Sequence, residues 1–361
     1  MRVKIGDLTN IKTGKLDANA SSEDGKYPFF TCSKEPLKIS TYSYDCECVL
    51  VAGNGDLNVK YYKGKFDAYQ RTYIIEDNGS GKLYMPYLYY FMESYIEELR
   101  KQAIGGGIKY IKLENLTNAM IELPSIHKQK VIVEILGKVK IIVNKHMDEI
   151  SMLDNLVKAR FVEMFGEPRS NPFGFEKMIL KDTCKIITGN TPSRAVDEYY
   201  GEFVEWIKTD NIVSGLLYPT KATEGLSEKG VKIGRTVDKD SILMACIAGS
   251  IASIGRVCIT DRRVAFNQQI NAIIPQKYNI HFLYVLLQIS KDYLVEDINM
   301  ALKGILSKSK LEEKEFVVPP KKLQEQFADF VHKVDKSKVV VQKSLYETQM
   351  LFDSLMQKYF G

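Results

Sequence analysis

The sequence has no long apolar run, although 45% of its 361 residues are hydrophobic and 26% are charged. No stretch approaches the ~18 consecutive apolar residues that a membrane span requires. The first seven residues place a charge at Lys4 and an acid at Asp7, so they lack the apolar core of a secretory signal. We therefore expect a soluble, cytoplasmic protein with no membrane partner.

Cysteine and histidine are too few and too scattered to indicate a disulfide framework or a metal centre. The chain has six cysteines and four histidines. Cys46 and Cys48 have the wrong spacing for a zinc site, and the histidines form no paired-ligand motif. We expect neither disulfides nor a bound metal.

Catalytic motifs are missing as well. An adenine methyltransferase needs a carboxamide-Pro-Pro-aromatic run to hold the flipped base, and the nearest string, residues 171–173 (NPF), lacks one proline. Residues 78–82 (NGSGK) resemble half of a phosphate-binding loop, but position 76 is Glu and Leu83 stands where a hydroxyl should bind magnesium. The acidic residues of 312–314 (EEK) are typical of a solvated face. We expect no catalytic residue and no resident cofactor.

Charge does not decide between classes of partner. A formal net charge of +5 permits nucleic-acid binding without requiring it.

The informative feature is an internal repeat. Residues 5–14 (IGDLTNIKTG) recur 175 positions later as residues 180–189 (LKDTCKIITG), and residues 68–71 (AYQR) recur as 265–268 (AFNQ) at a shift of 197. In the helical part the shift is 195 throughout: Pro124 corresponds to Pro319 and Gly166 to Gly361. Each copy therefore has a front of variable length and a back of fixed length.

These spans divide the chain into two copies of one plan. The fronts are residues 1–123 and 175–318, the backs are residues 124–166 and 319–361, and a linker covers residues 167–176. The fronts consist mostly of short β-branched and aromatic runs broken by Gly, Asn and Asp turns, which predict mixed, mostly β domains. The fold class is α+β, with helical stretches also expected near residues 86–102 and 280–299.

The backs predict two long helices with a heptad stripe of apolar residues. Residues 323–358 contain no Pro or Gly, and four apolar positions of the second back, 327, 330, 334 and 351, are also apolar in the first after subtraction of 195. The predicted core of this spacer comprises Ile132, Ile135, Val139, Leu153, Leu156, Phe327, Phe330, Val334, Val341, Leu351 and Leu355.

The short linker determines the direction of the helices. Ten residues reach at most about 34 Å, so the second front must start where the first helix ends, and the second helix must run back. We predict an antiparallel coiled-coil spacer about 60 Å long, related to itself by a pseudo-two-fold axis.

Four segments resemble the specificity subunits of type I restriction-modification enzymes: residues 188–193 (TGNTPS), 265–270 (AFNQQI), 123–130 (LPSIHKQK) and 156–166 (LVKARFVEMFG). The first copy departs from the pattern at residues 13–16 (TGKL). The resemblance implies two target-recognition domains alternating with two conserved helical regions, each domain reading one half of a split double-stranded DNA target. It also implies that two methyltransferase subunits dock on the helices and methylate adenine, and that restriction subunits complete the complex. S-adenosylmethionine, ATP and magnesium would then belong to the partner subunits alone.

DNA contacts are expected from polar and basic side chains on loops, because Arg suits guanine, Asn and Gln suit adenine, and Lys suits phosphate. The candidates in the two fronts are Lys34, Asn54, Asn58, Arg71, Lys109, Ser193, Arg194, Lys208, Asn211, Ser250 and Lys308. Gln70, Asn267 and Gln268 recur between domains that should read different sequences, which favours a shared structural role. Two other functions stay open: a stand-alone DNA-binding regulator, and a scaffold whose twin domains bind proteins.

Overall fold

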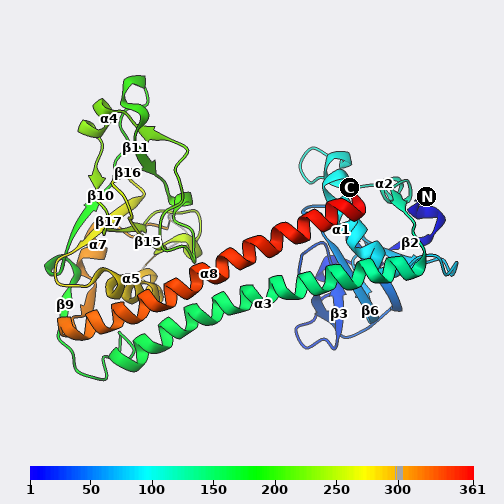
Figure 1. Cartoon of the computed structure of the whole chain (residues 1–361), viewed down its shortest axis with the longest axis horizontal. Coiled ribbons are helices and arrows are strands. Elements are labelled where there is room, and N and C mark those ends of the chain that lie inside the picture. The colour runs from blue at the N-terminus through cyan, green and yellow to red at the C-terminus, as the bar shows by residue number, and fades with distance from the viewer. Residues whose placement is uncertain (297, 299–303) are drawn as a thin grey trace. The chain divides into compact units, whose positions relative to one another are not determined.

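The computed structural model describes residues 1–296, 298 and 304–361 (Figure 1). The chain divides into two compact units: unit 1 is residues 1–148 with 342–361, and unit 2 is residues 149–341. The predicted long helices are present as α3 (Ile126–Phe165) and α8 (Lys321–Phe360), each 40 residues long. Each helix contributes one part to each unit.

Unit 1 is built on a six-stranded sheet with strand order β2-β7-β5-β6-β3-β4. Its strands are β2 (Thr9–Thr13), β3 (Tyr27–Phe30), β4 (Leu37–Ile39), β5 (Tyr44–Ala52), β6 (Val59–Ala68) and β7 (Thr72–Asp77). A separate antiparallel pair joins β1 (Arg2–Lys4) to β8 (Met120–Glu122). The helices of the front are α1 (Met85–Gln102) and α2 (Leu113–Thr117).

Unit 2 contains two four-stranded sheets, ordered β10-β17-β14-β15 and β12-β11-β16-β13, and the pair β18-β9. Its strands are β9 (Lys177–Ile179), β10 (Cys184–Thr188), β11 (Tyr200–Ile207), β12 (Gly225–Leu226), β13 (Thr236–Val237), β14 (Ile242–Ala245), β15 (Val257–Ile259), β16 (Val264–Phe266), β17 (Ile270–Pro275) and β18 (Glu315–Val317). Its helices are α4 (Glu228–Ile233), α5 (Ile280–Ile289), α6 (Lys291–Val295) and α7 (Lys308–Glu313). The helical stretch expected near residues 280–299 is thus two helices that meet at Ser290; residues 297 and 299 of it lie outside the described residues.

The two fronts differ in their sheets but share one parallel strand pairing, as the repeat predicts. In unit 1, β3 pairs with β6 in parallel, and in unit 2, β11 pairs with β16 in parallel. The glycine that ends each repeated segment, Gly14 or Gly189, is required by a close backbone contact. A Cβ on Gly14 would lie 2.2 Å from the carbonyl oxygen of Ala68, and one on Gly189 would lie 2.1 Å from that of Asn267. Only glycine permits this close approach of two chain segments.

Each unit has an apolar core that joins a front to the long helices. In unit 1, Ile132 and Leu136 of α3 and Phe352 and Leu355 of α8 pack with α1 on one face of the sheet. In unit 2, the rings of Phe161 and Phe165 of α3 pack on Phe282 of α5 and Phe327 of α8. Within unit 1 the first part of α3 therefore lies with the last part of α8, and within unit 2 the reverse holds. This antiparallel pairing agrees with the prediction.

The predicted stripe consists of two rows of heptad positions. One row is buried or partly buried, as predicted, and the other is shifted by one residue in the structure. Ile132, Val139, Phe327 and Val334 are buried as predicted, and Leu153, Phe330, Val341 and Leu355 are partly buried. Ile135, Leu156 and Leu351, which we predicted as core, are instead exposed. The second row of the heptad lies one position later, at residues 136, 143, 150 and 157 of α3 and 331, 338, 345 and 352 of α8. These two rows again differ by 195.

A buried glutamine continues one buried row at the start of each long helix: Gln129 in α3 and Gln324 in α8. Gln129 accepts a hydrogen bond from the backbone N–H of Tyr84 at 2.8 Å, and donates to the carbonyl oxygens of Lys82 and Pro124, both at 2.9 Å. Gln324 accepts from the N–H of Asn279 and donates to the carbonyl of Pro319, both at 2.8 Å. Tyr84 and Asn279 are the residues that precede α1 and α5. Each glutamine thus fixes the helix of its front to its long helix.

Within the described residues, no helix combines the length and the apolar character needed to cross a membrane.

Candidate nucleic-acid interface

A single loop of unit 1, residues 53–58, brings the five predicted side chains of the first domain together. Its Gly53 N–H donates to the carbonyl of Arg71 at 2.8 Å, and its Gly55 N–H donates to the carbonyl of Lys109 at 3.0 Å. Asn54 pairs with Tyr110, and the Asn58 amide donates to the carbonyl of Cys32, two residues from Lys34. The backbone therefore places four separate segments at one end of the sheet.

The five side chains differ in how free they are. Asn58 donates to the carbonyls of both Cys32 and Asp56 and accepts from Lys60, so its amide stabilises the loop. The ammonium of Lys34 lies 3.9 Å from Asp56 in an exposed pair, which holds it only weakly.

Three of the five candidates in the first domain remain available. In the part of the chain that the structure describes, the side chains of Asn54, Arg71 and Lys109 make no hydrogen bond or ion pair. Arg71 and Lys109 are also exposed. One amide and two cations are therefore free to meet a ligand.

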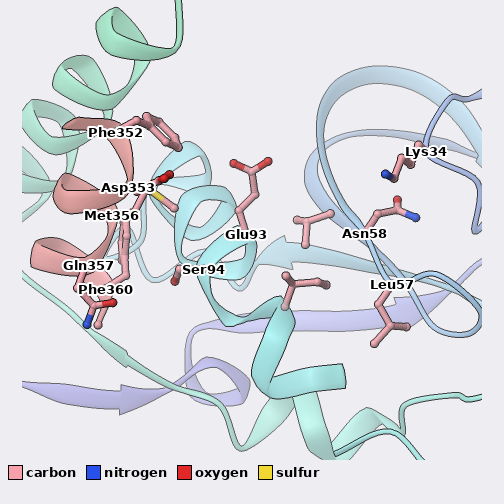
Figure 2. Close-up of a pocket in the computed structure, with 13 residues that line it drawn as sticks. Lys34, Leu57, Asn58, Glu93, Ser94, Phe352, Asp353, Met356, Gln357 and Phe360 are labelled. Carbon is pink, nitrogen blue, oxygen red and sulfur yellow. The ribbon is translucent and has the colours of Figure 1, made fainter. Parts of the chain in front are cut away.

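A cavity of about 630 Å³ lies beside this loop in unit 1 and is lined by the loop, α1 and the last turns of α8. Figure 2 shows the side chains that line it. Lys34, Leu57 and Asn58 of the front form one side, Glu93 and Ser94 come from α1, and Phe352, Asp353, Met356, Gln357 and Phe360 come from α8. Two of the predicted residues, Lys34 and Asn58, therefore stand where the loop meets the helices.

In unit 2 the turn at residues 267–269 organises the corresponding loops. Asn267 donates from its backbone to Ile207, which leads to Lys208 and Asn211, and the N–H of Cys246 donates to the carbonyl of Gln269. The side chain of Thr191 bonds that of Gln268, which brings in residues 190–194. Leu306 donates to the carbonyl of Cys246 and so draws in the segment that leads to Lys308, of which the structure describes the residues from 304 on.

Several predicted residues of the second domain are engaged in local structure. Asn211 accepts from the N–H of Lys208 and donates to Thr220 and Lys221. Ser250 bonds Ser253, and Lys308 pairs with Glu312 one helical turn away. Ser193 is exposed.

The shared residues of the turn have the structural role that we expected. The Asn267 side chain is buried and makes two hydrogen bonds with Gln269, and Gln70 donates to Asp17.

Arg194 and Lys208 belong to one charged cluster on an aromatic base. Both cations pair with Glu224, the guanidinium at 2.6 Å, and Arg194 lies over the rings of Tyr200 and Trp206. Hydrogen bonds from Lys208 and Arg194 hold the pKa of the Glu224 carboxyl below its ordinary value. Sequence reasoning found the two cations and missed Glu224, because 30 and 16 residues separate it from them and no local pattern connects the three.

Most candidates of the two domains thus lie on loops that follow corresponding strands, whereas Lys308 is the first residue of α7. Segments that follow β3, β5 and β6 in unit 1 match those that follow β11, β14 and β16 in unit 2. Free Arg, Lys and Asn side chains on such loops present the donors that base edges and phosphates accept. The chemistry available is recognition, and within the described residues no cluster of three His, Cys, Asp or Glu side chains is placed to hold a metal.

A family model described as the type I restriction modification DNA specificity domain matches residues 1–151 and 172–347. The chain belongs to this family. Its two matches cover one front each, together with much of the adjoining helix, as the internal repeat requires.

Three relatives are specificity subunits of type I restriction enzymes. The chain is 41% identical to the EcoDI subunit of Escherichia coli over 132 residues, which is 37% of this chain and 29% of that protein. It is 35% identical to the HindI subunit of Haemophilus influenzae over 120 residues, or 32% and 25% of the two chains. It is 28% identical to the MjaIX subunit of Methanocaldococcus jannaschii over 181 residues, or 48% and 41%. The matched regions thus span less than half of each relative.

Two solved structures share the fold over the full length. One is the type I restriction-modification S subunit from M. genitalium, with a TM-score of 0.62, 16% identity, and coverage of 100% of this chain and 96% of that one. The other comes from work on complex assembly and conformational transition of the type I system, with a TM-score of 0.56, 14% identity, and coverage of 100% and 97%.

Proposed function

We propose that this protein is the specificity subunit of a type I restriction-modification system, which reads a bipartite DNA target. The observation that carries the proposal is the matched gathering of basic and amide side chains at the same loop cluster of two repeated domains. Two readers in one chain suit a target with two separated halves. In the first domain, the free side chains of Asn54, Arg71 and Lys109 are the proposed contacts.

The long helices are the proposed docking surface for two methyltransferase subunits and the spacer between the two readers. Exposed apolar side chains support docking, because such patches are typical of protein interfaces. In unit 1 these include Val131, Ile135, Ile142, Met350 and Leu351, and in unit 2 they include Met152, Leu156, Val339 and Val340. Ile135, Leu156 and Leu351 therefore face outward where a partner can cover them.

The chain itself is proposed to be non-catalytic and to hold no cofactor. Adenine methylation and DNA cleavage are assigned to partner methyltransferase and restriction subunits, which would carry S-adenosylmethionine, ATP and magnesium. The proposed site of action is the cytoplasm. We predict that the purified chain shows no methyltransferase, nuclease or ATPase activity, measured with labelled S-adenosylmethionine, plasmid DNA and ATP. Turnover that survives denaturation and refolding of this single chain would contradict that prediction.

The experiment that tests the function is a titration with and without a methyltransferase subunit against split-site and random duplexes. The split site would first be found by sequencing methylated adenines in cells that express both subunits. We expect selective binding to the split site in the presence of the methyltransferase. Equal selectivity without it would favour a stand-alone DNA-binding regulator, and a failure to bind any duplex would favour a protein scaffold.

A further inference from the structure

The cluster around Glu224 in unit 2 is built so that one carboxylate holds two cations. One oxygen of Glu224 accepts from Arg194 at 2.6 Å, and its other oxygen pairs with the ammonium of Lys208. The backbone of Glu224 is fixed at the sheet edge, because its carbonyl accepts from the N–H of Trp206 at 3.0 Å and Gly225 begins β12.

The rings of Tyr200 and Trp206, which form the aromatic base of the cluster, pack against the same two cations. The guanidinium of Arg194 lies 4.5 Å from the ring centre of Tyr200 and 5.0 Å from that of Trp206, and the Lys208 ammonium lies 5.3 Å from the Trp206 ring. Trp206 is buried, while the Arg194 side chain is 55% exposed. The guanidinium therefore has one face on the rings and one face open to solvent.

The base also connects the cluster to the loops of the candidate interface. The Tyr200 hydroxyl donates to the carbonyl of Pro192 at 2.7 Å, and the Trp206 ring N–H donates to that of Asn190 at 3.3 Å. Between these residues, Thr191 bonds Gln268 of the central turn. The cluster is thus part of the loop assembly and not an isolated surface ion pair.

This arrangement affects the orientation of the Arg194 guanidinium more than it affects the stability of the fold. An exposed ion pair contributes little to folding, yet a planar guanidinium that is held on one edge and one face can point its remaining donors in only one direction. Of its five donors, Arg194 uses one nitrogen for Glu224. The donors left over match the paired acceptors that guanine presents in the major groove.

We propose that Glu224 is a specificity-determining residue of the second domain, which orients Arg194 toward a guanine of one half-site. It acts through Arg194, so it is a positioning residue and touches no base itself. The inference rests on the proposed function and adds to it the residue and the base that it selects.

The test compares Glu224→Gln with a matched control, Glu198→Gln. Glu198 also carries an exposed ion pair in unit 2, with Lys229 at 2.6 Å, but it lies outside the cluster. A third variant, Arg194→Lys, keeps a positive charge beside Glu224 and loses the planar fork. Each variant is purified with the methyltransferase subunit, and competition binding is measured against duplexes that change one base pair of the split site at a time, at several salt concentrations.

We expect Glu224→Gln to lose discrimination at one G·C pair of one half-site by about 5- to 150-fold, the range for a bidentate contact. Arg194→Lys should lose discrimination at the same pair, and Glu198→Gln should match the parent protein at every position. Thermal melting of Glu224→Gln should stay close to that of the parent, and if that variant does not fold, Arg194→Lys decides the question.

Two results would overturn the inference. One is a Glu224→Gln protein that binds all duplexes more tightly with a steeper salt dependence and unchanged base preference, because Glu224 would then only neutralise charge. The other is full discrimination by Arg194→Lys. A parent complex without preference for any split site would instead remove the proposed function, and this inference with it.

Discussion

Gln129 and Gln324 are polar residues in positions that a heptad would fill with leucine. Both are buried, and their amide groups satisfy backbone atoms that the packing has removed from water. A buried N–H or carbonyl that loses its partner keeps its full desolvation cost. These residues therefore contribute to stability through hydrogen bonds that hydrophobic burial cannot replace.

Gln324→Leu should lower the free energy of unfolding by about 1–3 kcal/mol, because it orphans the N–H of Asn279 and the carbonyl of Pro319. Urea unfolding followed by circular dichroism measures the loss. Gln326→Leu, at an exposed position of the same helix, is the control and should change little. Equal stability of the two variants would contradict this role.

The pair formed by His281 of α5 and His332 of α8 makes the stability of unit 2 depend on pH. Their rings lie 4.1 Å apart, and burial, with the charge of His332, lowers the pKa of His281 to about 4. An unfolded histidine titrates near pH 6.5, so the unfolded state takes up the proton first as the pH falls. The stabilising contribution of neutral His281 is therefore complete above about pH 6.5 and is lost progressively toward pH 4.

We predict that the melting temperature falls between about pH 6.5 and pH 4, and that His281→Gln flattens this part of the profile. Thermal melting at a series of pH values measures the effect. His127→Gln, which removes an exposed histidine, serves as the control and should leave the slope unchanged. A parent slope that persists in His281→Gln would assign the pH dependence to other groups.

At the scale of elements, the heptad spacing of the long helices was predictable from the sequence. The exact positions of one of its two buried rows were not. The sequence of α3 places apolar residues at both 135 and 136, at 142 and 143, and at 156 and 157. Periodicity cannot choose between adjacent apolar positions. In the structure the later residue of each pair is buried or partly buried and the earlier one is exposed. The exposed residue of each pair can then contact a partner subunit. The apolar pattern of one chain does not distinguish such a residue from a core residue.

The candidate interface shows the same division. Turn chemistry and the repeat predicted which loops carry the polar residues, and the structure brings those loops together. Which side chains are already engaged depends on distant partners, such as Asn58 with Cys32 and Arg194 with Glu224. Hydrogen bonds between residues 26 and 30 positions apart leave no trace in local sequence.

The matched rows of the two helices lead to a prediction about spacing. Seven residues inserted after Lys145 and seven after Val340, its equivalent 195 positions later, keep both buried rows in register. The spacer would lengthen by about 10 Å, so the gap between half-sites should grow by about three base pairs while the bases read stay the same. Sequencing of methylated sites in cells that express the variant with its methyltransferase gives the result.

The same insertion in one helix alone is the control. It leaves one row without opposite residues, so we expect a less stable protein with reduced methylation. A doubly extended variant that remains active and still marks the original gap would show that the helices do not set the spacing.

At the scale of the whole molecule, the fronts should be separable readers. Replacing residues 175–318 exchanges everything between the linker and the second helix, including the β9-β18 pair at its base. With the corresponding stretch of a relative in place, one half of the methylated target should change and the other half should not. Methylome sequencing reads both halves at once, and a change in both would contradict the modular arrangement.

The paired glutamines have a consequence for how such proteins evolve. Gln129, Tyr84 and Pro124 correspond to Gln324, Asn279 and Pro319 at one constant offset of 195, so the two junctions are the same joint made twice. Tyr84 and Asn279 contribute only backbone N–H groups to it, which any residue except proline supplies. A new front delivered by gene recombination can therefore form this hydrogen bond with any non-proline residue at that position, provided that it also keeps the apolar contacts of α1 or α5 with the long helices. The variable part of the protein can therefore diversify in its loops, while the helix that packs on α3 and α8 must keep its apolar face.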